Sequence, residues 1–154
     1  MKESPKPPRR IVFICTGNCI RSQMAEGLLR HLAGNRFWIG SAGVMPAGYV
    51  HEHAIEVMDE IGIDISQQES KGLDELALPQ GTLPDVLVTL CDYAVELVPN
   101  STGRVQHLHW PLDDPIMARG SPEERLEVFR LAREKIRARL EQALADGELE
   151  RPPR

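Results

Sequence analysis

The sequence predicts an α/β domain in which helices cover both faces of a parallel sheet, and three observations lead to this prediction. Short runs of apolar, mostly β-branched residues alternate with longer segments whose apolar residues recur at helical spacing. The connections between these segments are short and often hold glycine or proline. No linker or internal repeat divides the 154 residues. Alternation of this kind is typical of parallel sheets flanked by helices.

The N-terminal part predicts a tail, a strand and a helix in that order. Residues 1–9 are rich in proline and cations, so we expect a flexible tail there. We expect a single domain over residues 10–146 and a C-terminal tail over residues 147–154. The apolar run 11–14 predicts a buried strand, and the spacing over residues 22–32 predicts an amphipathic helix.

The middle of the chain predicts two more strands with a helix between them. Residues 37–39 predict the second strand, which we expect to end at the small residues 40–43. The apolar spacing over residues 54–61 predicts a helix that stops at Gly62, in the manner of a C-cap. Residues 86–90 form the most apolar run and predict a buried strand.

The C-terminal part predicts a fourth strand over residues 105–108 and a long helix. Ser121, Pro122 and Glu124 stand at the N-cap, first and third positions of that helix, which is a capping box with a first-turn proline. One face of the helix is apolar, and we expect it to pack on the sheet. Its residues are Leu126, Phe129, Ala132, Ile136, Leu140 and Ala143.

Composition excludes several classes of function. Lys and Arg number 18 against 23 Asp and Glu, so the net charge of −5 gives no basic excess for nucleic-acid binding. No apolar run approaches the roughly 20 residues that span a bilayer. Three cysteines do not suggest a disulfide framework, so we expect a cytoplasmic protein with reduced thiols. His51 and His53 would face different sides of a helix, and we expect no metal site there.

The segment between the first strand and the first helix predicts an oxyanion-binding loop. Backbone N–H groups that turn inward beside a helix N-terminus form a nest for a tetrahedral anion, and the carboxyl ends of parallel strands are where ligands bind. The residues that we expect to line this nest are Thr16, Gly17, Asn18, Cys19, Ile20, Arg21 and Ser22.

Two side chains give this loop its predicted chemistry. The planar guanidinium of Arg21 can hold two oxygens of one anion. The same positive surroundings favour a nucleophilic thiolate at Cys15, to which the Ser22 hydroxyl can donate a hydrogen bond. We expect a left-handed backbone at Gly17, with Asn18 as the next most tolerant position.

Cys15, the five residues after it and Arg21-Ser22 resemble the phosphate-binding loop of the low-molecular-weight protein tyrosine phosphatases. The longer run over residues 15–27 resembles, more narrowly, the arsenate reductases that are built on the same fold. Four further segments continue the similarity in the expected order, over about residues 10–142: 41–43, 62–66, 88–91 and 109–115. The resemblance implies a three-layer sandwich with a four-stranded parallel sheet flanked by helices.

The resemblance also implies roles for individual residues. Cys15 would attack arsenate, and Asp114, held in an extended conformation by Pro115, would protonate the departing oxygen. Cys91 would attack the arsenylated Cys15, release arsenite and leave a disulfide. Phosphatases of the family usually carry aromatic residues after the Asp-Pro pair, whereas residues 116–117 here are Ile and Met.

The sequence departs from the arsenate reductases at three positions. Cys19 stands where serine is typical, Ile20 replaces a second loop cysteine, and Val98 replaces the third thiol of the thioredoxin-coupled members. A disulfide between Cys91 and Cys15 or Cys19 and Cys15 would therefore be reduced directly by an external thiol: thioredoxin, glutaredoxin or a small thiol such as glutathione. We expect no other cofactor.

Three functions remain open from the sequence. The first is an arsenate reductase. The second is a tyrosine phosphatase that hydrolyses phosphomonoesters through a phosphorylated Cys15, with a phosphotyrosine protein as its partner, because phosphate and arsenate have nearly the same shape. The third is a non-catalytic oxyanion-binding or redox-sensing protein, in which Cys15 and Cys19 form a reversible disulfide.

Overall fold

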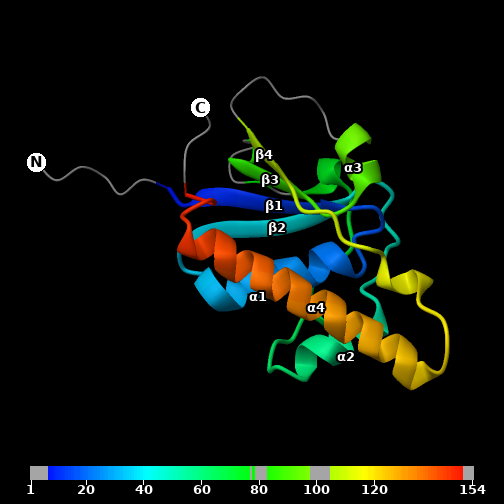
Figure 1. Cartoon of the computed structure of the whole chain (residues 1–154). Helices are drawn as coiled ribbons and strands as arrows, with labels where there is room; N and C mark the ends of the chain where they lie inside the picture. The colour runs from blue at the N-terminus through cyan, green and yellow to red at the C-terminus, as the bar shows by residue number, and fades with distance from the viewer. Residues whose placement is uncertain (1–6, 77, 79–82, 98–104, 151–154) are drawn as a thin grey trace, which may run out of the picture.

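The four strands of the chain form one parallel sheet, as Figure 1 shows for the computed structural model, which describes residues 7–76, 78, 83–97 and 105–150. The strands are β1 (Arg9–Cys15), β2 (Phe37–Gly43), β3 (Val86–Thr89) and β4 (Gln106–His109). Their order is β2-β1-β3-β4, and all three neighbouring pairs are parallel. The predicted four-stranded parallel sheet flanked by helices is confirmed.

Helices and helical turns connect the strands and cover the sheet. They are α1 (Arg21–Ala33), α2 (Glu52–Asp59), η1 (Leu73–Glu75), α3 (Asp92–Leu97), η3 (Pro115–Met117) and α4 (Pro122–Ala145). Helix α1 packs on β1 and β2, whereas α3 contacts β1 and β3. All residues from Ile11 to Cys15 are buried, so both faces of the central strand are covered.

Helix α4 begins with the predicted capping box. The Ser121 hydroxyl accepts a hydrogen bond from the Glu124 N–H at 3.1 Å, and the Glu124 carboxylate accepts one from the Ser121 N–H at 3.2 Å. The six apolar residues that we expected on its inner face are all buried in one core with the strands. Helix α4 also lies along α1 and against α2 (Figure 1).

Strand β2 continues through the small residues 40–43, where the sequence predicted its end. The prediction was wrong because these residues pair with residues 12–15 of β1 and allow a close approach to the loop that follows. A Cβ atom on Gly43 would lie 2.8 Å from the Thr16 carbonyl oxygen and 2.9 Å from the Asn18 nitrogen. The extension brings Ser41, which is fully buried, beside the loop.

The two ends of the domain meet at the first strand. Gly147 has a φ of +68° and ends α4, after which Leu149 packs into the core. The Arg9 Nε donates a hydrogen bond to the Leu149 carbonyl at 2.9 Å. Residues 9 and 149, which the sequence assigned to a flexible N-terminal tail and a C-terminal tail, are thus part of the packed structure. Among the described residues, no helix is long and apolar enough to cross a membrane.

Candidate active site

The loop between β1 and α1 turns through a left-handed residue at Asn18, whose φ is 48°. The sequence predicted this conformation at Gly17, which does not adopt it. Asn18 takes it because its side chain is anchored at both ends. Its Oδ1 accepts a hydrogen bond from the Lys71 N–H at 2.9 Å, and its Nδ2 donates to Ser22 Oγ at 2.7 Å. The Asn18 side chain therefore joins the loop to α1.

The sulfur of Cys15 lies at the buried end of β1, among hydrogen-bond donors. Its Sγ is 2.9 Å from Ser22 Oγ and 3.3 Å from the Asn18 nitrogen, whose N–H points to it. Cys15 is only 2% exposed. The predicted contact with Ser22 is confirmed, and both neighbours can donate hydrogen bonds to a thiolate.

A buried polar chain holds the loop in place from behind. Asn18 Nδ2 also donates to Ser41 Oγ at 3.0 Å, and Ser41 Oγ donates to Glu26 Oε1 at 2.6 Å. The other Glu26 oxygen accepts a hydrogen bond from Arg30 at 3.0 Å. Buried polar groups that are satisfied in this way rigidify their surroundings. Residues from β2 and α1 thus fix the position of the loop that β1 leads into.

Arg21 and Asp114 meet at the open side of the loop. Arg21 is 5% exposed, and its Nη1 donates to the Leu112 carbonyl at 2.9 Å. Its Nη2 lies 3.3 Å from Asp114 Oδ2. The other carboxylate oxygen, Asp114 Oδ1, accepts a hydrogen bond from the Ile116 N–H at 3.1 Å and so caps the start of η3. The structure therefore brings the predicted anion-binding cation and the predicted acid together.

A cavity of about 520 Å³ opens beside this pair. The side chains that line it come from distant parts of the sequence and include this charged pair and the thiol of Cys91. They are Arg21, Cys91, Asp92, Pro111, Leu112, Asp113, Asp114 and Lys135.

Cys91 joins the site from the end of β3. Its Sγ lies 3.3 Å from Thr16 Oγ1 in the loop, and the residue is 7% exposed. Asp92, directly after it, begins α3, a helix that the sequence did not predict. An acidic residue at the start of a short segment after a strand is a common helix-start signal and could have indicated that helix.

Cys19, the other loop cysteine, is partly buried and differs from Cys15 in its surroundings. Burial raises the pKa of the Cys19 thiol to about 11, and the nearby negative charges of Cys15 and Asp114 add to this effect, against the opposing charge of Arg21. Such a thiol is protonated and poorly nucleophilic at neutral pH. All three cysteines are free.

The two histidines of residues 51–53 have a structural role. His51 Nδ1 accepts a hydrogen bond from the His53 N–H at 3.0 Å and so caps α2. Burial lowers the pKa of His51, and the neighbouring His53 lowers it further. Within the described ranges, no group of three or more His, Cys, Asp or Glu residues could hold a metal ion.

This combination of parallel sheet, cysteine loop and facing acid is that of a phosphatase fold. Residues 10–152 match the model of the low molecular weight phosphotyrosine protein phosphatase family, and the chain belongs to that family. The chain is accordingly an enzyme of this superfamily, as predicted.

Several of its relatives within the superfamily are named arsenate reductases. One from Halalkalibacterium halodurans is 42% identical over 130 residues, which cover 84% of this chain and 91% of the relative. The solved structure of an arsenate reductase in its phosphate-binding state has a TM-score of 0.72 and 33% identity, covering 90% of this chain and 98% of that one. A thioredoxin-dependent arsenate reductase of Corynebacterium glutamicum has a TM-score of 0.66 and 26% identity, covering 93% of this chain and 65% of its own. The resemblance to this branch is confirmed.

Proposed function

We propose that the chain is an arsenate reductase in which Cys15 attacks arsenate and Cys91 releases arsenite. The observation that carries this proposal is the Cys91 thiol in the cavity that also holds Arg21 and Asp114, in contact with Thr16 of the loop. A phosphatase of this fold resolves its intermediate with water and has no use for a second thiol there. The names of the relatives support the same function.

The first step forms a bond between sulfur and arsenic. Arg21 and the backbone N–H groups of residues 16–21 hold the oxyanion oxygens. The Cys15 thiolate attacks arsenic, and one arsenic–oxygen bond breaks. Asp114 donates its proton to the departing oxygen, which leaves as water. Cys19, Ile20 and Ser22 complete the loop through their backbone, while the Ile20 side chain is buried in the core and the Ser22 hydroxyl contacts the Cys15 sulfur.

The second step transfers two electrons to arsenic. The Cys91 sulfur attacks the Cys15 sulfur, and a disulfide forms as the bond between sulfur and arsenic breaks. The electron pair of that bond stays on arsenic, which leaves as arsenite, and the Cys91 proton passes to solvent. Two thiols are oxidised, and As(V) is reduced to As(III).

The end of β3 lies beside the end of β1, so Cys15 and Cys91 lie at the ends of neighbouring strands. Ile14 pairs with Thr89, and the Leu90 N–H donates to the Ile14 carbonyl at 2.8 Å. Cys91 therefore lies one residue beyond the position opposite Cys15. Formation of this disulfide requires the two Cα atoms to lie within roughly 4.4–6.8 Å of each other.

An external thiol then returns the disulfide to two thiols in the cytoplasm. Val98, which lies outside the described residues, cannot act as a third thiol. The reductant is therefore thioredoxin, glutaredoxin or a small thiol such as glutathione. The thioredoxin dependence of the C. glutamicum relative supports the first of these.

A phosphatase is the second candidate, because the loop and Asp114 suffice for hydrolysis of a phosphomonoester and the family carries that name. The residues after Asp114-Pro115, Ile116 and Met117, are exposed and apolar but not aromatic. A redox switch between Cys15 and Cys19 is disfavoured by the raised pKa of Cys19, which leaves little thiolate at neutral pH.

The test is single-turnover arsenite release from the pre-reduced protein without any external reductant. We expect near-stoichiometric arsenite from the natural sequence and from a Cys19→Ser control, and none from Cys15→Ser or Cys91→Ser. Hydrolysis of an aryl phosphate should persist in Cys91→Ser and vanish in Cys15→Ser. Steady hydrolysis without arsenite from the natural protein, even after addition of glutathione, would assign the chain to the phosphatases.

A further inference from the structure

The residues on the two sides of Cys91 are tied to one histidine. Thr89, two residues before Cys91, pairs with His109 across β3 and β4, and its Oγ1 lies 2.7 Å from His109 Nδ1. Asp92, directly after Cys91, lies with its Oδ1 2.8 Å from His109 Nε2. The imidazole therefore bridges the end of β3 and the start of α3.

The hydrogen bonds of this bridge can form a series in which each group donates to the next, from His107 through Thr89 and His109 to Asp92. His107 Nε2 lies 2.9 Å from Thr89 Oγ1 and can donate to it. The Thr89 hydroxyl can then donate to His109 Nδ1 at 2.7 Å, which is closer than the Leu108 carbonyl at 3.5 Å. His109 Nε2–H then donates to the Asp92 carboxylate, which only accepts. Burial lowers the pKa of His107, and the neighbouring His109 adds to this effect.

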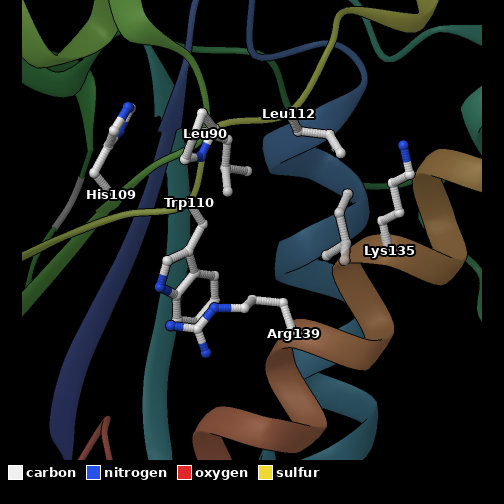
Figure 2. A pocket seen from close by; sticks show the side chains of 8 residues that line it. Leu90, His109, Trp110, Leu112, Lys135 and Arg139 are labelled. Carbon is white, nitrogen blue, oxygen red and sulfur yellow. The ribbon is translucent and has the colours of Figure 1, made fainter.

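His109 also stands at the edge of a second cavity of about 330 Å³ beneath the active site. Figure 2 shows Leu90 and Trp110 on one side of it and Lys135 of α4 on the other, with Arg139 reaching from α4 to the Trp110 ring and His109 set apart from them. Leu112 and Lys135 line this cavity and the larger one that holds Cys91. The bridge thus lies next to the site, but it does not touch the anion-binding loop.

We propose that His109 is a positioning residue for the second thiol, an inference that rests on the proposed reductase function. By holding Thr89 and Asp92 together, it fixes Cys91 between them, with the sulfur directed at Thr16 and the loop. Attack on the arsenylated Cys15 requires this placement, because disulfide formation tolerates little variation in distance. Aryl phosphate hydrolysis, which uses Cys15, Arg21 and Asp114, does not require it.

The exposed end of the bridge allows a test that spares the fold. The Asp92 side chain is 91% exposed, so Asp92→Ala removes the second half of the bridge without opening the core. Asp92→Asn keeps an oxygen that accepts from His109 Nε2. Asp113→Ala removes an equal charge from the same cavity but leaves the bridge intact. His109→Asn keeps a group near Thr89 but is too short to reach Asp92.

Three rates are compared in these variants: single-turnover arsenite release, alkylation of Cys91 by iodoacetamide followed on its peptide mass, and aryl phosphate hydrolysis. We expect Asp92→Ala and His109→Asn to slow arsenite release about fivefold, the loss of one hydrogen bond, and to speed Cys91 alkylation. Asp92→Asn and Asp113→Ala should stay within about twofold of the natural protein in both measures. Hydrolysis should not change in Asp92→Ala.

Arsenite release at the natural rate in Asp92→Ala overturns the proposal, as does an equal loss in Asp113→Ala. If the natural protein releases no arsenite, the proposed function itself has failed, and the alkylation rates then decide the inference alone. Faster alkylation of Cys91 in Asp92→Ala than in Asp113→Ala supports the bridge, and equal rates overturn it.

Discussion

The two cysteines that we propose for the reaction are held in very different ways. Cys15 is enclosed by a loop whose polar side chains are joined to β2 and α1 through Asn18, Ser41 and Glu26, all buried. Cys91 lies at a strand end, where its sulfur contacts Thr16 and a surface carboxylate completes the support of its backbone. The step shared with phosphatases is thus built on a rigid site, whereas the step specific to reduction depends on a lightly held segment.

The largest effect that separates the two regions is expected at Arg21. Arg21→Lys replaces a planar fork with a point charge and removes the anchor on Leu112, so kcat/KM for an aryl phosphate should fall by about 10²–10³. Arg119→Lys, at an exposed arginine, is the matched control. Steady-state kinetics decide the point, and a loss below tenfold would contradict the assigned role.

A smaller effect is expected from the packing beneath the loop. Gly43→Ala places a Cβ within 3 Å of backbone atoms of Thr16 and Asn18 and should lower the free energy of unfolding by about 1–3 kcal/mol. In Gly17→Ala the new atom meets only the Cys19 sulfur at 3.3 Å and Ala47 Cβ at 3.8 Å, and the loss should stay below about 1 kcal/mol. Urea unfolding measures both. Equal losses would mean that the loop does not rest on β2 as described.

The contact between Thr16 and Cys91 links the two regions, and we expect its removal to have a smaller effect on the reaction rate. Thr16→Val removes the hydroxyl that contacts Cys91 and should slow single-turnover arsenite release about two- to tenfold, as the loss of one neutral hydrogen bond does. Thr16→Ser keeps the hydroxyl and serves as the control. Aryl phosphate hydrolysis should be unchanged in both variants. A parallel loss of both activities would instead assign the Thr16 side chain to the loop itself.

The smallest effect near neutral pH is expected at Cys19. With a pKa raised to about 11, its thiol is protonated below that value and gains reactivity only as pH rises. Alkylation of Cys19 by iodoacetamide should therefore increase about tenfold per pH unit up to that range. Cys19→Ser should change hydrolysis less than about twofold. Rapid alkylation at pH 7.5 that levels off below pH 9 would refute the effect of burial.

The rigid region was the more predictable from the sequence. Strand, loop and helix follow one another over residues 11–32, so the nucleophile, Arg21 and the contact of Ser22 with Cys15 could be inferred from local spacing. The left-handed residue was misplaced at Gly17, because the contacts that hold Asn18 come from Lys71 and Ser41, distant in sequence. The Gly-Ser-Ala-Gly run of β2 resembles a turn until its pairing with β1 is known.

The region around Cys91 was predicted only through family resemblance. Helix α3 is six residues long, too short for a periodic signal. The bridge through His109 depends on the register of β3 and β4, which spacing along the chain does not determine. The burial of Leu149 was not predicted either. Asp146-Gly147 is typical of the end of a helix and of a domain, and only the structure shows that the chain turns back to the core after Gly147.

The hydrogen bond between Arg9 and Leu149 also makes the domain a candidate for circular permutation. It joins the two ends of the fold at the start of β1, whereas Cys15 lies six residues along, about 20 Å away at the other end of the strand. A short linker that joins residue 149 to residue 9 would therefore leave the loop untouched. New ends could be opened at the exposed Gly120, between η3 and α4, so that the order of synthesis changes while the chemistry does not.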